Sequence, residues 1–272
     1  MRSFKGMPES IPVNPAESGL EVRTYFVRNR NALVARASFS ELFVDYYLHL
    51  SDQKIRLGPE LDTMFRRALV GLTLHLASRP WNEMVAWTMH FQQPLVNLFL
   101  TGDNADGALT GRVFEENVRE METNVFYADV VRGKEPKRRS AVNFTGDDPL
   151  RTVESFYAQS EQRAAKFFQI GEEEFVLVAE HPDCDHAWFE ALTTESVKAL
   201  DTAETLALME RRIYRWHCGC NQHRMLEVLA PTAKQDIGAL FEADEKIEIR
   251  CPRCGARYTI TREAVEAFLA EP

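Results

Sequence analysis

Long apolar runs are missing from this chain of 272 residues. Residues 1–12 are polar and contain no apolar stretch, so no secretory signal is predicted there. The most apolar helical stretch, residues 69–77, contains Thr73 and His75 and is too short to cross a bilayer. We therefore expect a cytoplasmic protein with no membrane partner.

An excess of positive charge is also missing. The chain has 32 Lys and Arg residues against 41 Asp and Glu residues, a net charge of −9. This balance weighs against general binding to nucleic acids. The sequence has no glycine-rich phosphate loop, no nucleophile elbow and no paired-histidine metal site, so it is not expected to be an enzyme.

Cysteine is scarce, with five residues in the whole chain. In the reducing cytosol, so few cysteines are not expected to form a framework of structural disulfides. Four of them lie in two short-spaced pairs near the C-terminus, which points to metal or redox chemistry.

Sequence periodicity predicts an α+β fold. Apolar residues recur at helical spacing between Gly58-Pro59 and Pro80, and Asp148-Pro149 predicts the start of a long helix through Phe167. Extended segments or strands are predicted at 22–39, 85–91, 95–101, 108–114, 124–131 and 174–179, with a further helix at 42–50. We expect a larger mixed helix and sheet N-terminal domain (1–180), a helical linker (181–212) and a small C-terminal four-cysteine zinc domain (213–272).

The first cysteine pair has the pattern Cys218-Gly219-Cys220, and the second, which follows after positions 221–250, has the pattern Cys251-Pro252-Arg253-Cys254. Zinc prefers four soft ligands in a tetrahedron, and two short-spaced pairs supply them when the fold brings the pairs together. The residues around the second pair alternate as two strands that meet at a knuckle. A capping-box pattern at 232–235 predicts the start of one helix, and a final helix is predicted from Thr261. We therefore predict a Zn²⁺ site with ligands Cys218, Cys220, Cys251 and Cys254.

Most four-cysteine zinc sites are permanently structural. A single residue between two ligands is unusual, however, and a Cys-x-Cys disulfide would close a small, strained ring of the kind that tends to be labile. An oxidative switch is consistent with this spacing, although the spacing alone leaves both readings open.

Other candidate residues are given structural roles. His217 and His223 flank the first pair, but four cysteines already fill a tetrahedral site. Cys184 lies between carboxylates that disfavour its thiolate, so it is interpreted as an incidental linker thiol. A basic cluster is interpreted as a solvated loop: Lys134, Lys137, Arg138 and Arg139.

These motifs together resemble the 33 kDa chaperonin family. The resemblance rests on the two cysteine pairs and their separation, on the strand–turn–strand that ends in Gly107-Ala108-Leu109-Thr110-Gly111, and on Tyr157-Ala158-Gln159-Ser160-Glu161-Gln162. This chain departs from the family pattern in a shorter stretch before the first cysteine. It also has Pro136-Lys137-Arg138-Arg139 where the family tends to have Pro-Tyr-x-Gly.

The resemblance implies a redox-regulated, ATP-independent holdase. Such a protein is zinc-bound and inactive when reduced. Oxidation would pair Cys218 with Cys220 and Cys251 with Cys254, release zinc and unfold the C-terminal domain. The implied partners are unfolded or partly folded client proteins, together with a second copy of the chain on oxidation.

Two other functions compete with this interpretation. A zinc ribbon that binds nucleic acid is disfavoured because residues 211–272 carry ten Lys and Arg against nine Asp and Glu. A thiol-disulfide oxidoreductase would need Cys251 and Cys254 to begin a helix, whereas a strand is predicted after them.

Overall fold

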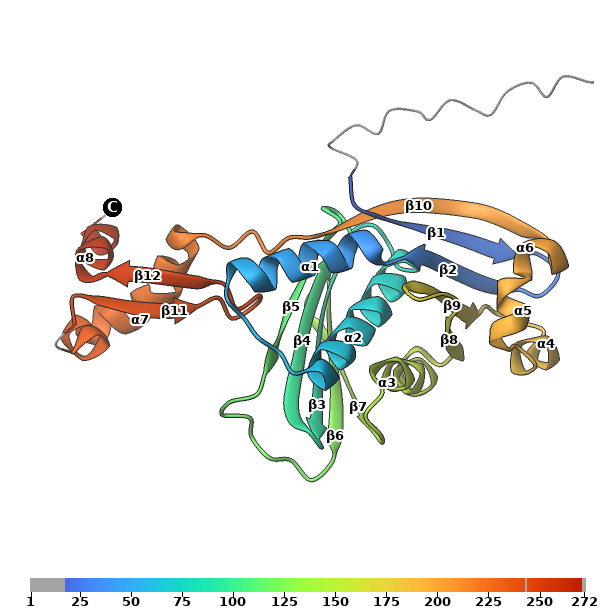
Figure 1. The fold of residues 1–272 in the computed structure, drawn as a ribbon, viewed down its shortest axis with the longest axis horizontal. Helices are drawn as coiled ribbons and strands as arrows, with labels where there is room; N and C mark the ends of the chain where they lie inside the picture. The colour runs from blue at the N-terminus through green and yellow to red at the C-terminus, as the bar shows by residue number, and fades with distance from the viewer. Residues whose placement is uncertain (1–17, 243, 271–272) are drawn as a thin grey trace, which may run out of the picture.

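The structure, a computed structural model, describes residues 18–242 and 244–270. The polar stretch 1–12 therefore lies outside the described residues. A large body, residues 18–216, carries a small C-terminal module, residues 218–270, at one end (Figure 1). Within the described ranges, none of the helices combines the length and hydropathy needed to span a membrane.

The body is built on one long sheet with the strand order β7-β6-β3-β4-β5-β10-β1-β2-β9-β8. Its strands are β1 (Leu20–Val27), β2 (Ala32–Ser38), β3 (Glu83–Gln92), β4 (Leu95–Asp103), β5 (Ala108–Phe114), β6 (Asn124–Arg132), β7 (Arg138–Phe144), β8 (Ala165–Gln169), β9 (Glu174–Glu180) and β10 (Leu206–Trp216). Its helices are α1 (Ser40–Asp52), α2 (Pro59–Ala77), α3 (Pro149–Phe156), α4 (His186–Glu190), α5 (Thr194–Lys198) and α6 (Leu200–Ala203). The predicted α+β class is confirmed.

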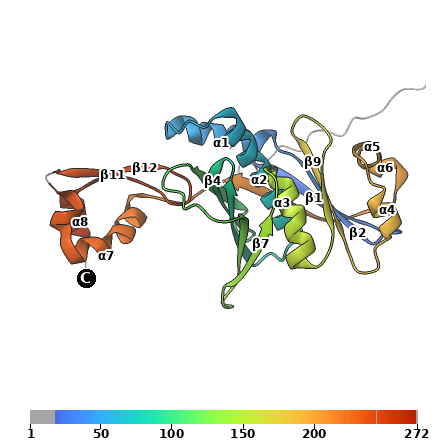
Figure 2. The same ribbon diagram turned by 90° about the horizontal axis from the view of Figure 1, so that it is seen from below.

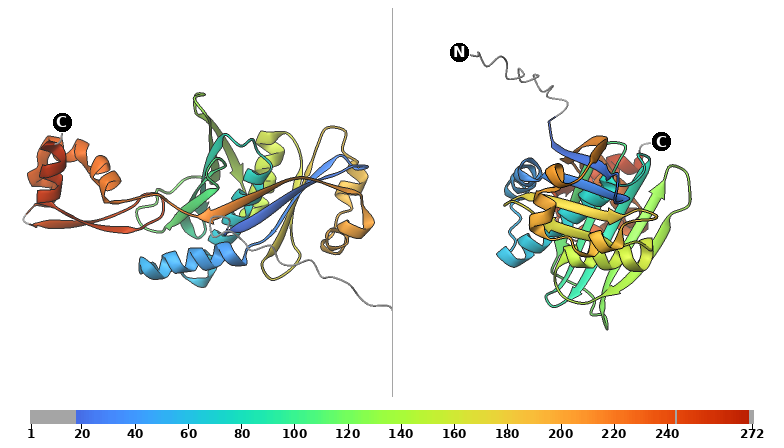
Figure 3. Two further views of the ribbon diagram at one scale, coloured as in Figure 1. Left: turned by 90° about the horizontal axis from the view of Figure 1, so that it is seen from above. Right: turned by 90° about the vertical axis from the view of Figure 1, so that its right-hand side faces the viewer.

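Strand β10 joins the two halves of the sheet. It pairs antiparallel with β1 over most of its length and parallel with β5 through only Arg215↔Ala108 and Trp216↔Leu109. Figure 3 shows this strand running along the body toward the C-terminal module. The chain that enters the first cysteine pair is therefore held by the sheet up to Trp216.

Helix α2 forms the centre of the core. It begins after Gly58 with Pro59 in its first turn, as predicted, and its second half is almost entirely buried. It packs against α3 and against both halves of the sheet. At Gly71 an added Cβ would lie 3.1 Å from Val153, so glycine permits the close approach of α2 and α3 (Figure 2).

Two expectations about the body were wrong. The helix that starts at Pro149 ends at Phe156 in a π-helical turn, η2 (Tyr157–Glu161), and Phe167 lies in strand β8. The expected loop at residues 138–139 is the start of β7. In both places pairing with a neighbouring strand outweighs the local pattern.

The expected helical linker is only partly helical. Helices α4, α5 and α6 pack a second apolar cluster against β2 and β9, but Leu206–Trp216 form β10 rather than a helix. Charges interleaved with Leu206 and Met209 resemble an amphipathic helix. These residues form a strand because they pair with β1, the first strand of the body.

The C-terminal module has its own core. It contains α7 (Gln222–Phe241), the hairpin β11 (Lys246–Arg250) and β12 (Arg257–Thr261), and α8 (Arg262–Ala270). Its buried cluster consists entirely of residues that follow Trp216. The predicted capping box at 232–235 is wrong, because α7 already begins at Gln222. The helical backbone is interrupted at Asp236, whose carboxylate caps the last turn by accepting from the amide of Ala239 at 2.9 Å.

Gly107 is required where β5 meets β10. Its φ of +63° is left-handed, and an added Cβ would lie 2.2 Å from the carbonyl oxygen of Ile213 in β10. We predict that Gly107→Ala lowers the free energy of unfolding by about 2–3 kcal/mol, measured by urea denaturation. The matched control is Gly133→Ala, which has a similar φ of +53° but no atom closer than 4.0 Å, and should cost only about 1 kcal/mol. Equal losses would mean that contact with β10 is unimportant.

Candidate metal centre

The second cysteine pair lies at the tip of the β11–β12 hairpin. The last register pair of the hairpin is Arg250↔Arg257, and the turn between them contains Cys251 and Cys254. The amide of Gly255 donates to the carbonyl of Cys251 at 2.9 Å, and the amide of Cys251 donates to the carbonyl of Ala256 at 2.8 Å. Gly255 has a φ of +76°, which favours glycine. The predicted knuckle between two strands is confirmed.

The first pair lies on the loop between β10 and α7. Gly219 separates the two cysteines with a φ of +66°, and this turn directs both sulfur atoms toward the hairpin tip. Asn221 then caps α7 by accepting from the amide of Arg224 at 2.9 Å. The loop is therefore fixed on one side by the sheet and on the other by a capped helix.

The four sulfur atoms form one cluster. All lie within 4.8 Å of one another, with Sγ–Sγ separations of 3.7 Å for Cys218–Cys251 and 3.5 Å for Cys220–Cys254. A tetrahedral zinc ion with Zn–S bonds of about 2.3 Å requires sulfur atoms about 3.8 Å apart. The donor set and its spacing therefore fit a soft divalent metal ion.

The thiol pKa values of Cys218 and Cys251 are shifted in opposite directions. The hydrogen bond between Cys218 and Cys251 raises the pKa of the Cys218 thiol to about 11 and lowers that of Cys251. Cys251 is therefore the favoured thiolate of this pair. Burial, followed by a hydrogen bond from its hydroxyl to Cys220 Sγ at 3.0 Å, raises the pKa of Tyr258. Tyr258 thus stays protonated as a donor to sulfur.

The body contacts the knuckle through residues that the sequence did not reveal. Nη1 of Arg112 in β5 donates to the carbonyl of Cys251 at 3.1 Å, and Nε2 of His49 in α1 lies 2.9 Å from the carbonyl of Cys254. From the module, Arg253 donates to Oγ1 of Thr101 at 2.9 Å. These partners lie far from the cysteines in the sequence, so no local motif could have identified them.

The other candidates lie outside the cluster. Neither His217 nor His223 belongs to the group of close ligand atoms found in the described part of the chain, and both are exposed. His223 packs on Phe268 and pairs with Glu227. Cys184 is buried in the apolar cluster under α4, and burial followed by the charge of Glu180 raises its pKa, in the direction predicted.

The basic cluster is partly neutralised. Arg139 and Lys137 both pair with Asp129 on the adjacent strand β6, and Arg138 lies 3.9 Å from Glu83. These cations support the edge of the sheet.

Fold and site together define a two-part α+β protein whose C-terminal module carries a four-cysteine cluster able to hold a metal ion. A family model described as "Hsp33 protein" matches residues 169–261. A protein named 33 kDa chaperonin from Proteus mirabilis is 27% identical over 234 residues, which are 72% of this chain and 80% of the relative. A 33 kDa chaperonin from Caldanaerobacter subterraneus is 32% identical over 68 residues, 25% of this chain and 23% of that one.

A solved structure has the same fold. The crystal structure of the 33 kDa chaperonin of Thermotoga maritima has a TM-score of 0.71 at 14% identity and covers 93% of this chain and 98% of that chain. The resemblance of this chain to the 33 kDa chaperonin family, expected from the cysteine pairs and two body motifs, is thus confirmed.

Proposed function

We propose that this protein is a redox-regulated, ATP-independent holdase of the cytoplasm, which binds zinc and is inactive while reduced. In this proposal the client-protecting part is the body, residues 18–216, which includes the segment 181–212 expected as a linker, and the switch is the module, residues 218–270. The observation that carries the proposal is the single cluster of four cysteine sulfur atoms in a module with its own small core. The protein performs no catalytic turnover in this proposal.

Zinc is the metal that suits this donor set. Four thiolates in a tetrahedron are typical of structural zinc, and the small core of the module leaves much of its folding free energy to the metal. Zinc, when bound, holds Cys218, Cys220, Cys251 and Cys254 together. Cys251 and Cys254 are buried, whereas Cys218 and Cys220 are partly exposed and accessible to an oxidant.

The proposed switch is oxidative loss of this metal. A strong oxidant such as hypochlorous acid would convert Cys218 and Cys220, and Cys251 and Cys254, into two disulfides. The strand pairing of the sheet ends at Trp216, just before Cys218. Unfolding of the module would therefore weaken the short pairing between β10 and β5. Apolar surface freed in this way would bind unfolded clients, and oxidised chains would dimerise through it.

The test is light scattering from a thermally unfolding client without ATP, with a chromogenic chelator in the same cuvette to report zinc release. We expect the reduced, zinc-loaded protein to leave aggregation unchanged and the oxidised protein to suppress it in step with zinc release. Suppression in both states would make the zinc purely structural. Suppression in neither state would contradict the holdase function.

A further inference from the structure

Arg112 is unusually placed for an arginine. Its guanidinium lies at the contact between body and module, donates to the carbonyl of Cys251 and stacks over Phe114 at 4.2 Å. No carboxylate within ion-pair distance of it is found in the described part of the chain. Several other partly buried arginines of the body do have such a partner, for example Arg79 with Glu83 and Arg67 with Asp148.

Basic side chains outnumber acidic ones around Arg112. Burial and then the positive charge of Arg250 lower its pKa, while the thiolates of Cys251 and Cys254 oppose this and Glu116 contributes least. A cavity of about 850 Å³ separates the body from the module here. Besides Arg112, its wall contains the basic residues Lys54, Arg56, Arg250 and Arg257, which outnumber the acidic side chains there. The charged side chains that line this cavity therefore carry a net positive formal charge.

A zinc ion with four thiolates carries a formal charge of −2, the sum of one divalent cation and four anions. Such a cluster is the negative partner that Arg112 lacks. We propose that Arg112 is a positioning residue of the redox switch: it docks the reduced module on the body through the charge of the metal–thiolate cluster and releases it when that charge is lost. This inference rests on the proposed function and names how the same site is regulated.

The charge balance explains the release. Each disulfide forms when two thiolates lose two electrons, and one peroxide molecule accepts them with two protons and leaves as two water molecules. Two disulfides therefore consume two peroxide molecules and four protons and release Zn²⁺. The site changes from a charge of −2 to zero. The repulsion between Arg112 and Arg250 is then no longer offset by the charge of the cluster, and it favours separation of module and body.

The first measurement is zinc affinity by chelator competition in the full chain. Arg112→Met keeps an unbranched apolar chain over Phe114 but removes the charge and the donor. We expect its zinc affinity to fall about 10–100-fold, as for the loss of other residues that support metal ligands. Arg112→Lys should restore most of the affinity. The matched control is Arg56→Met, which removes a positive charge from the same cavity wall without a contact to the knuckle.

Salt dependence separates an electrostatic role from a merely structural one. We expect the rate of peroxide-induced zinc release from the unmodified protein to rise several-fold between about 0.05 and 0.5 M NaCl, since the Debye length shortens over this range. The rate for Arg112→Met should be high and nearly independent of salt. Hydrogen exchange of residues 251–258 in zinc-saturated protein should be faster in this variant and unchanged in Arg56→Met.

Zinc affinity and salt dependence in Arg112→Met that match the unmodified protein would overturn the inference while leaving the proposed function intact. Failure of the unmodified protein to bind zinc, or to release it on oxidation, would instead overturn the proposed function. The two failures are therefore distinguishable from the behaviour of the unmodified protein alone.

Discussion

Replacing Cys251 by serine is expected to lower zinc affinity by about a thousandfold, equivalent to about 4 kcal/mol of binding free energy. Cys251 is almost fully buried and is the thiolate favoured by the hydrogen bond from Cys218. A serine hydroxyl is a poor ligand for zinc beside three thiolates. The change therefore removes one of the four thiolate ligands.

The loss should unfold the module and leave the body folded. The module's buried cluster lies within residues 225–265 and includes the two hairpin cysteines, so metal binding and module folding are coupled. Among the residues that the structure describes, the two apolar clusters of the body are made of body residues alone. Tryptophan fluorescence should report this separation, because all four tryptophans belong to the body: Trp81, Trp87, Trp188 and Trp216.

The measurement is zinc stoichiometry and affinity by chelator competition, with circular dichroism of the same samples. Cys184→Ser is the matched control, since it removes a buried thiol that lies outside the cluster. It should bind one zinc ion with unchanged affinity. If Cys251→Ser retained the parent affinity, Cys251 would not be a ligand.

Elements with a strong local pattern could be predicted from the sequence. Helix α2 begins with a proline and has a continuous apolar face, and in β3 large apolar residues alternate from Val85 to Phe91. By contrast, β10 is stabilised by β1 and β5, which lie far from it in the sequence, and nothing local distinguishes it from a charged helix. The π-helical turn after Phe156 could not be predicted for a related reason, because the apolar spacing up to Phe167 is also that of a helix.

In the metal site, too, some residues could be predicted from a local motif and others only from the fold. Cysteine spacing alone identified the four residues that the fold brings together, because metal ligands carry their chemistry in their side chains. Arg112, His49 and Thr101 act on the knuckle from three different elements of the body. Two of these contacts are made to backbone carbonyls. Every residue has a backbone carbonyl, so the sequence does not show which carbonyl accepts a hydrogen bond. Only the fold could reveal them.

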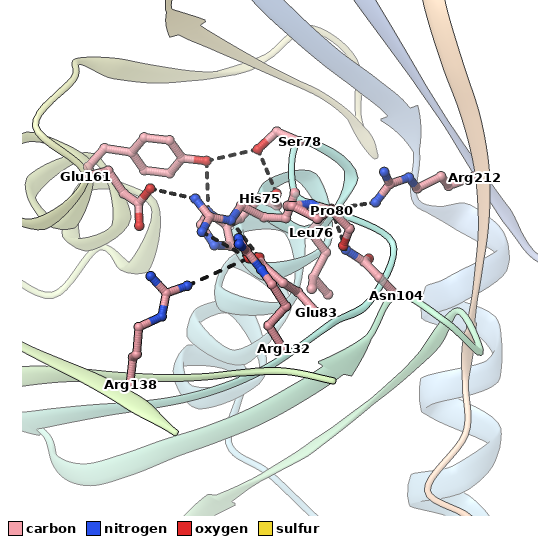
Figure 4. Close-up of polar contacts among 12 residues, drawn as sticks. His75, Leu76, Ser78, Pro80, Glu83, Asn104, Arg132, Arg138, Glu161 and Arg212 are labelled. Carbon is pink, nitrogen blue, oxygen red and sulfur yellow. Dashed lines mark hydrogen bonds and ion pairs between the residues drawn. The ribbon is translucent and has the colours of Figure 1, made fainter. Parts of the chain in front are cut away.

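The second large effect is expected in the body. Glu83→Gln should lower the free energy of unfolding of the body by about 3–5 kcal/mol, because Glu83 is a buried carboxylate held between arginines. Its side chain has 0% exposure, with Oε2 2.8 Å from Nε of Arg79 and Oε1 3.1 Å from Nε of Arg132. Figure 4 shows the network in which it sits.

This network ties several elements together. Arg79 also pairs with Glu161 of η2 at 2.6 Å, and the carbonyl of Leu76 accepts from Asn104 and from Arg212 of β10 at 3.0 Å (Figure 4). A neutral amide at position 83 would leave two guanidinium groups without their shared anion. The matched control is Glu190→Gln, whose carboxylate is 72% exposed beside Lys166 and should cost less than about 1 kcal/mol.

The pH dependence follows from the same contacts. Burial raises the pKa of Glu83, but its ion pairs with Arg79 and Arg132 outweigh burial and leave the pKa below 4.5. A carboxylate with a depressed pKa in the folded state contributes stability above the unfolded value, and this contribution is lost as pH falls through the folded value. Urea denaturation between about pH 7 and pH 3 should therefore show a steeper loss below about pH 4.5 in the unmodified protein than in Glu83→Gln.

A measurement of zinc affinity distinguishes the stability loss in Glu83→Gln from the effect of Cys251→Ser. The ion pairs of Glu83 are with Arg79, Arg132 and Arg138, all in the body, so Glu83→Gln should weaken the body while zinc affinity at pH 7 stays within about twofold of the parent. Cys251→Ser should do the reverse. If each variant destabilises only its own part of the protein, the body and the module have cores that fold separately. A loss of zinc affinity in Glu83→Gln would instead mean that strain in the body reaches the knuckle, through β10 or through the contact of Arg112 with Cys251.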